Sequence, residues 1–216
     1  MSENQKQGSG KRPWYFRRKK KPVEAPKPKG NYAFIDSQNL NLGVQKMGWK
    51  MDWAKLREWL RAEYNVEQAF MFIGYMQENE SLYQQMYDHG FLVVLKPTVE
   101  IKQPKLPESK PGEKSVKKTD EPEKPPVKGN VDADLVLYAM KELPNYDKAI
   151  IISGDGDFFA LVEYLIEQKK LLKLMTPNRR FSSLLQGFDT YIDGIDQHRN
   201  QLAYRDFRRG RNKRQT

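Results

Sequence analysis

Short apolar runs alternate with amphipathic segments along most of this chain, and this alternation constrains the fold more than any other feature. Runs such as AIIIS (149–153) are apolar on both sides, as expected of a strand that is buried on both faces. Strands that alternate with helices pair in parallel and are covered by helices on both faces. The sequence therefore predicts an α/β fold, a Rossmann-like three-layer α/β/α sandwich with a mainly parallel central sheet.

The element boundaries follow from apolar spacing and from the residues at the ends of each segment. Asp52 is placed to cap a helix, and Gly90 is placed to end one. The aromatic stripe of Trp53, Trp59 and Tyr64 is expected in the core rather than on a base-stacking surface. We expect strands at 32–36, 66–75, 91–97, 148–155, 171–176 and 190–193, and helices at 52–64, 78–90, 131–143, 157–168 and 181–188.

Charge divides the chain into a mildly acidic centre and two basic ends. Residues 1–30 carry ten Lys or Arg and two acids, and residues 198–216 carry seven and one, in a chain of net charge +10. Basic ends on an acidic body favour a polyanionic partner, most often nucleic acid. We expect a disordered basic tail at 1–30, one domain at 31–197 and a basic Arg-rich tail at 198–216. Within the domain, 100–128 is almost wholly Lys, Glu, Pro and Ser, which predicts a flexible insertion.

Two further features exclude whole classes of protein. Cysteine is absent, which excludes a disulfide framework and a thiolate metal site. No apolar run approaches the roughly 20 residues of a membrane-spanning helix, and no apolar segment follows the basic N-terminus as it does in a secretory signal. We expect a cytoplasmic protein without a membrane span.

Acidic residues follow two of the expected strands, one in each half of the domain. Asp36 ends YAFID, Asp155 and Asp157 follow AIIIS, and Asp132 begins the helix that leads into the second of these strands. Ligands of open parallel sheets bind beyond the carboxyl ends of the strands, where the strand order reverses. The two strands begin the two halves of the domain and are natural neighbours at that point. We therefore expect the four aspartates to converge on one pocket.

Carboxylates that share a pocket destabilise one another unless a cation joins them. Hard oxygen ligands without cysteine favour Mg²⁺ or Mn²⁺ over zinc. Such an ion can lower the pKa of a bound water and hold a phosphodiester. Asn39, one helical turn after Asp36, adds an amide that can meet a metal-bound water or a phosphate.

Other interpretations of these acids account for less. A calcium loop of the EF-hand type needs Gly at its sixth position and Glu at its twelfth, where counting from Asp155 gives Ala160 and Ile166. A phosphatase with an aspartyl nucleophile stays open, although IDSQN lacks a second acid two residues after Asp36. A structural interpretation makes Asp157 the N-cap of its helix and GDG a turn, but it leaves Asp36 unexplained.

Three motifs in this order, FIDSQNL, KGNVDADLVL and SGDGDFFALV, resemble the NYN domain, a branch of the PIN-like nucleases. The resemblance covers roughly residues 31–195 and implies an α/β/α sandwich, a divalent metal held by acidic residues, and ribonuclease activity in several members. Some NYN proteins are RNA-binding or regulatory, so the fold alone leaves activity open. By position, the motifs imply a site whose main acids are Asp36, Asp132, Asp155 and Asp157. Asn39 lies beside these acids in the first motif, Ser153 opens the last motif, and Asp134 is an additional acid.

Basic residues are the remaining candidates for contact with substrate. Two follow a strand end and can hold phosphate, and the others lie in the tails, where neighbouring aromatics can stack on bases. Solvated loop arginines and solubilising tails are the alternatives. Together with Asn39 and Ser153, which we expect to bind substrate at the acidic site, we expect the following to contact RNA: Arg17, Arg18, Arg179, Arg180, Arg208 and Arg209.

The leading hypothesis is a metal-dependent ribonuclease that acts on RNA, expected to be single-stranded, through the acidic site. The alternative from another class is a non-catalytic RNA-binding or adaptor protein that uses its tails. A phosphatase on the same sheet is a third option. The sequence leaves open whether the protein forms a homodimer.

Overall fold

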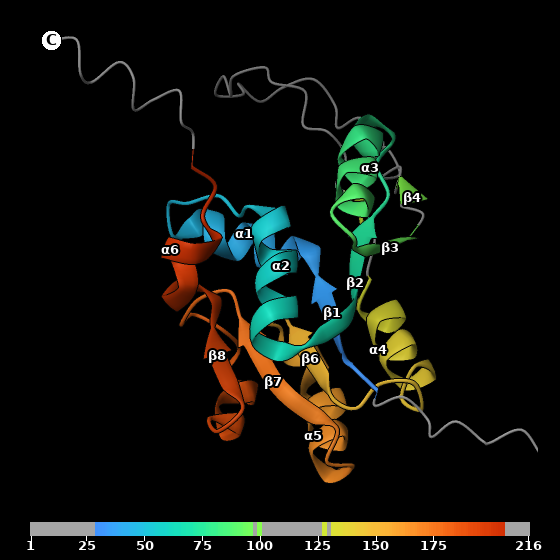
Figure 1. The fold of residues 1–216 in the computed structure, drawn as a ribbon, viewed down its shortest axis with the longest axis vertical. Coiled ribbons are helices and arrows are strands. Elements are labelled where there is room, and N and C mark those ends of the chain that lie inside the picture. Colours follow the sequence, from blue (N-terminus) through green and yellow to red (C-terminus); the bar gives the residue numbers. More distant parts are fainter. Residues whose placement is uncertain (1–28, 97–98, 101–126, 129–130, 206–216) are drawn as a thin grey trace, which may run out of the picture.

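A parallel sheet forms the centre of the structure, a computed structural model that describes residues 29–96, 99–100, 127–128 and 131–205 (Figure 1). Its six strands lie in the order β3-β2-β1-β6-β7-β8, and every neighbouring pair is parallel. The strands are β1 (Asn31–Asp36), β2 (Val66–Gly74), β3 (Leu92–Lys96), β6 (Ala149–Ile152), β7 (Leu171–Thr176) and β8 (Ile192–Gly194).

Helices cover both faces of the sheet, which confirms the predicted three-layer α/β/α sandwich (Figure 1). One face packs against α1 (Ser37–Lys46), α2 (Trp53–Tyr64), α3 (Glu80–Asp88) and α6 (Arg199–Leu202). The other packs against α4 (Asp132–Lys141) and α5 (Phe159–Glu167). Because β1 and β6 lead to helices on opposite faces, the strand order reverses between them.

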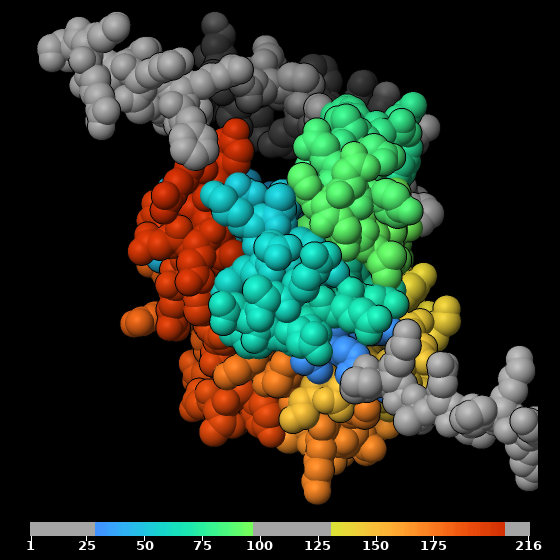
Figure 2. Space-filling model, in the orientation of Figure 1, coloured from blue at the N-terminus to red at the C-terminus, as the bar shows by residue number. Residues whose placement is uncertain are grey.

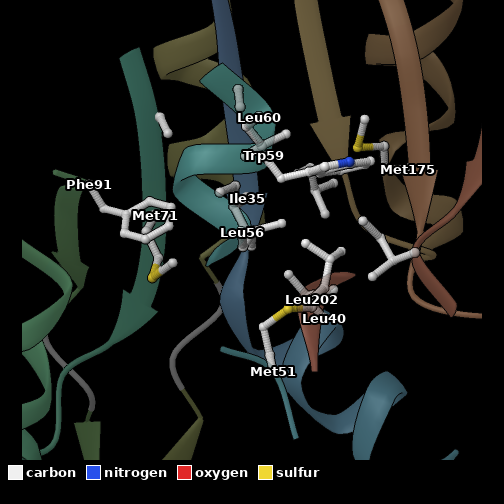
Figure 3. Close-up of a cluster of buried hydrophobic side chains, with 14 of the residues drawn as sticks. Ile35, Leu40, Met51, Leu56, Trp59, Leu60, Met71, Phe91, Met175 and Leu202 are labelled. Carbon is white, nitrogen blue, oxygen red and sulfur yellow. The ribbon is translucent and has the colours of Figure 1, made fainter. Parts of the chain in front are cut away.

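Two separate apolar cores result from the alternation of side chains along the buried strands. Ala33 and Ile35 of β1 face the core under α1 and α2, whereas Phe34 faces the core under α4 and α5. Figure 3 shows the first of these cores. Trp59 lies within it, and Trp53 and Tyr64 pack against it, so the predicted aromatic stripe is part of the core.

The predicted signals at helix ends are confirmed for the segment from α2 to α3. The carboxylate of Asp52 caps α2 by accepting a hydrogen bond from the amide of Lys55 at 3.2 Å. Gly90 follows α3 with a φ of 87°, a left-handed conformation that glycine adopts without strain.

Several elements differ from the sequence prediction. Helix α1 was not predicted, because only Leu40 and Val44 bury apolar side chains in this mostly polar segment. The predicted helix 181–188 is the 3₁₀ helix η4 (Ser183–Phe188), and η3 (Gly156–Phe158) precedes α5. A short 3₁₀ turn, η2 (Gln77–Asn79), also precedes α3.

The ends of the predicted insertion lie together. The antiparallel pair β4 (Val99–Glu100) and β5 (Val127–Lys128) joins them, and most of 100–128 lies outside the described residues. The proposed boundary at residue 197 falls within η5 (Ile195–His198), and α6 then places Leu202 in the core. Within the described ranges, no helix is long and apolar enough to cross a membrane.

Candidate active site

The two acidic motifs meet at the carboxyl edge of the sheet. Strands β1 and β6 are hydrogen-bonded neighbours, with Ile35 opposite Ile152, so Asp36 and Ser153 leave the sheet side by side. Asp132 is the first residue of α4, which covers the opposite face from α1. The predicted adjacency of the two strands is therefore confirmed, and it lies where the strand order reverses.

A buried hydrogen-bond network joins the two strand ends. Ser153 Oγ donates to Asp36 Oδ2 at 3.1 Å and accepts from the amide of Asp155 at 3.2 Å. The other carboxylate oxygen of Asp36 accepts from the amide of Asn39 at 3.0 Å, which makes Asp36 the N-cap of α1. Asn39 Oδ1 in turn accepts from the amide of Gly154 at 2.9 Å. The side chains of Asp36, Asn39 and Ser153 thus hold the backbone that follows β1 against the backbone that follows β6.

Asp155, and not Asp157, caps the turn that follows β6. Asp155 Oδ1 accepts from the amide of Asp157 at 3.1 Å and is the N-cap of η3. The interpretation that Asp157 caps the helix is therefore wrong, and its exposed carboxylate makes no capping bond. Capping occurs one turn earlier because η3 inserts a 3₁₀ turn before α5.

Gly156 allows two segments of the chain to pack closely against each other. Its φ lies outside the left-handed range that favours glycine, so the predicted tight turn does not need it. A Cβ at this position would lie 2.4 Å from Ser182 Oγ and 3.0 Å from Leu184 Cδ1. The absence of a side chain therefore lets the η4 segment pack against the acidic loop.

The carboxylates of Asp36, Asp155 and Asp157 lie near enough to Asp132 to influence its pKa. Burial, together with the negative charges of Asp36, Asp155 and Asp157, raises the pKa of Asp132 to about 6. Burial also raises the pKa of Asp36, with a contribution from Asp155 that the hydrogen bonds from Asn39 and Ser153 oppose. Burial and the neighbouring carboxylates therefore both favour the protonated form of Asp132 and of Asp36.

Lys96 is a cation of this site that the sequence analysis missed. It ends β3 and forms an ion pair with Asp134 at 3.2 Å, so the additional acid of the second motif faces β3. The positive charge of Lys96 also lowers the pKa of Asp132, but burial and the neighbouring carboxylates raise it by more. No sequence signal places Lys96 here, because the contact depends on how α4 packs beside the edge strand.

The donor set suits a hard divalent cation, although the carboxylates are not gathered around one point. Aspartate oxygens are the ligands that Mg²⁺ and Mn²⁺ prefer, and burial together with neighbouring carboxylates raises the pKa values of Asp36 and Asp132. Across the ranges that the structure describes, no three Asp, Glu or His side chains are close enough to form a metal-binding group.

A cavity of about 420 Å³ adjoins the acidic loop on the side of α1. Lys46 and Arg180 line it from α1 and from the loop after β7, whereas Arg179 does not line it. Asn39 and Gly154 are shared between this cavity and the network described above. Arg180 was predicted from the sequence, but Lys46 was not, because it reaches the cavity only through the packing of α1 against the loop after β7.

Residues 1–28 and 206–216, which make up most of the two predicted tails, lie outside the part of the chain that the structure describes. This applies to Arg17, Arg18, Arg208 and Arg209, whose contact with RNA stays a prediction.

Comparison with known proteins identifies the family and agrees with the fold. The family model described as "NYN domain" matches residues 32–196. The chain is 26% identical over 167 residues to the low amplitude and bright protein LabA of Synechococcus elongatus, covering 74% of this chain and 81% of that protein. A protein of unknown function from Vibrio parahaemolyticus, VPA0982, has the same fold, with a TM-score of 0.58, 22% identity, and coverage of 83% of this chain and 99% of that one.

The matched family gives these likenesses a chemical context. NYN domains belong to the PIN-like nuclease superfamily. They are generally nuclease-type RNA-binding domains, and PIN-like nucleases typically use divalent metal ions.

Proposed function

The chain belongs to the NYN domain family of PIN-like nucleases, and from this premise we propose that it is a metal-dependent ribonuclease acting on single-stranded RNA. The observation that carries the proposal is the raised pKa of Asp132. Burial is the largest cause of this shift, and three other carboxylates, from β1 and from the loop after β6, add to it. Acids from three separate elements repel one another there, which a structural role would not require.

We assign the metal-binding role to Asp36, Asp132, Asp155 and Asp157. A Mg²⁺ or Mn²⁺ ion would supply a Lewis acid that lowers the pKa of a bound water and offsets charge on a phosphodiester. Asp36 is held in place by Ser153 and the amide of Asn39, so one carboxylate is oriented before any ion arrives. The other three acids are less buried and can adjust toward it.

Substrate phosphate is assigned to the cavity beside the acidic loop. Lys46 and Arg180 offer positive charge on two sides of it, and Gly154 links it to the carboxylates. Carboxylates alone would repel RNA, so these cations and the basic tails must supply the attraction. The affinity for RNA is therefore expected to fall as the salt concentration rises.

The test is cleavage of a single-stranded RNA with Mn²⁺ by the wild type, Asp155→Asn and Asp147→Asn. The side-chain amide oxygen that Asp155→Asn introduces can still accept the bond from the backbone amide of Asp157, so the loop should stay folded. Asp147 is an exposed acid before β6, at the opposite edge of the sheet, and serves as the matched control. We expect loss of cleavage only in Asp155→Asn. Equal cleavage by all three proteins would remove the assignment, and turnover of a small phosphoester without RNA cleavage would favour a phosphatase.

One observation favours a second candidate, a non-catalytic RNA-binding protein. The carboxylates form no ready metal-binding group among the described residues. In that case the tails bind RNA and the domain serves as a scaffold. Deletion of 1–28 and 206–216 separates the two, because the scaffold protein would lose RNA binding altogether and would show no metal-dependent turnover at any RNA concentration.

A further inference from the structure

A second cavity, of about 450 Å³, lies on the other side of the first turn of α1. It is open on one side and is lined by α1, α2, the end of β2 and the segment from η2 to α3. Figure 2 shows the teal α2 and the green α3 side by side on one face of the molecule. Its volume falls in the range of small-molecule sites, roughly 300–1,000 Å³.

The lining of this cavity is apolar on its walls and neutral throughout. Trp53 and three methionines provide flat or adaptable apolar surface, and Met76 and Leu82 are 39% and 40% exposed. No charged side chain is among the lining residues. They are Ser37, Gln38, Asn41, Trp53, Met71, Ile73, Gly74, Met76, Asn79, Leu82 and Met86.

Three side-chain amides add hydrogen-bonding groups to this apolar surface. Asn41 Oδ1 accepts from Gln45 at 3.2 Å, which leaves the amino group of Asn41 available. The side chains of Gln38 and Asn79 make no hydrogen bond to any other residue in the described part of the chain. Donors and acceptors are therefore available beside the apolar walls.

We propose that this cavity binds one nucleobase of the RNA. A base is a flat ring with donors and acceptors on its edge, so it suits aromatic and methionine surface combined with uncharged amides. A phosphate would need cations, which line the other cavity instead. An aliphatic ligand would leave the amides without partners, at a cost in binding.

The position of the cavity gives it a role in substrate choice, an inference that rests on the proposed ribonuclease function. Ser37 and Gln38 line the cavity and directly follow Asp36 in the chain. A base held there therefore places a neighbouring phosphate at the acidic edge of the sheet. Cleavage is then expected to prefer one base at a fixed position relative to the bond that breaks.

Binding of free nucleosides tests this site without any need for cleavage. Trp53 lines the cavity, so its fluorescence should change saturably as adenosine, guanosine, cytidine or uridine is added to the full chain. We expect one nucleoside to bind at least threefold more tightly than the others. We expect Gln38→Leu and Asn79→Leu to weaken that binding about tenfold, as loss of one hydrogen bond to the ligand does.

Two control variants sharpen the measurement. Trp53→Phe should remove the fluorescence change, which identifies its source. Gln85→Leu makes the same change on an exposed residue of α3 outside the cavity and should leave binding unaltered.

The outcomes separate this inference from the ribonuclease proposal. Nucleoside binding without RNA cleavage supports the base site and contradicts the ribonuclease. RNA cleavage with no base preference, together with no fluorescence change for any nucleoside, overturns the base site and leaves the ribonuclease in place. The base site is also overturned if Gln38→Leu and Gln85→Leu change nucleoside binding equally. A saturable fluorescence response to an apolar peptide, but to no nucleoside, would overturn it as well.

Discussion

The hydroxyl of Ser153 donates to Asp36 Oδ2 at 3.1 Å across the boundary between β6 and β1, and both residues are buried. This bond joins the two motifs that lie more than a hundred residues apart in the chain. The same oxygen accepts from the amide of Asp155, so one side chain orients both acidic segments.

Ser153→Ala should therefore destabilise the protein and weaken metal binding. The buried carboxylate of Asp36 and the partly buried amide of Asp155 lose their partner, which costs about 1–3 kcal/mol. The pKa of Asp36 should rise further, because the hydroxyl bond lowers it. Urea unfolding and Mn²⁺ titration measure the two effects. Ser81→Ala, on the exposed face of α3, is the control and should change neither.

The pH dependence of stability should report on Asp132. Its pKa is about 6 in the folded protein and about 4 in an unfolded chain. The unfolded state therefore loses its proton first as the pH rises, and stability should fall between these two values. Because the carboxylate is partly exposed, we expect a loss of only about 1 kcal/mol.

Thermal unfolding of wild type and Asp132→Asn between pH 4 and pH 7 checks this prediction, with the pH range set by the two pKa values. The wild type should lose stability relative to Asp132→Asn across the interval, and added Mn²⁺ should restore it above pH 6. If stability changed with pH in the same way for the two proteins, the pKa of Asp132 would not be raised in the folded state, and the prediction would be wrong.

Gly156→Ala should displace the η4 segment from the acidic loop. The new Cβ would lie 2.4 Å from Ser182 Oγ, and Ser182 is tied to the loop by its amide, which donates to the carbonyl of Gly154 at 3.0 Å. Such overpacking costs about 1–3 kcal/mol. Gly187→Ala is the matched control, because its Cβ would meet nothing within 4 Å. Denaturant unfolding should show the loss in Gly156→Ala alone.

Lys46→Gln and Arg180→Gln should each reduce the salt dependence of RNA binding. One phosphate contact contributes about 0.7 to the slope of log affinity against log salt for single strands. Arg179→Gln removes the same charge from a neighbouring residue that does not line the cavity and should alter the slope less. Equal slopes for Arg179→Gln and Arg180→Gln would place phosphate elsewhere.

The strands and the acidic edge could be predicted from the sequence because both depend on local patterns. AIII of β6 is buried at all four positions, and such runs identify central strands without any knowledge of their neighbours. Asp36 and Asp155 could be placed together because each follows a strand that begins one half of the domain.

The residues that were missed depend on packing between distant segments. Lys46 reaches the phosphate cavity because α1 packs tightly on the loop after β7, where a Cβ on Gly43 would lie 2.3 Å from Pro177. The capping role of Asp155 was missed because Asp155 and Asp157 fit the same local pattern, and only the 3₁₀ turn decides between them. The neutral cavity between α1 and α3 has no motif in the sequence.

The most direct test of the central claim is anomalous diffraction from crystals soaked in Mn²⁺ at neutral pH, for the wild type and Asp155→Asn. We predict one anomalous peak in the wild type, within bonding distance of carboxylate oxygens from Asp36, Asp132, Asp155 and Asp157, and its loss in the variant. A fully soaked wild-type crystal with no peak among these four residues would contradict the account.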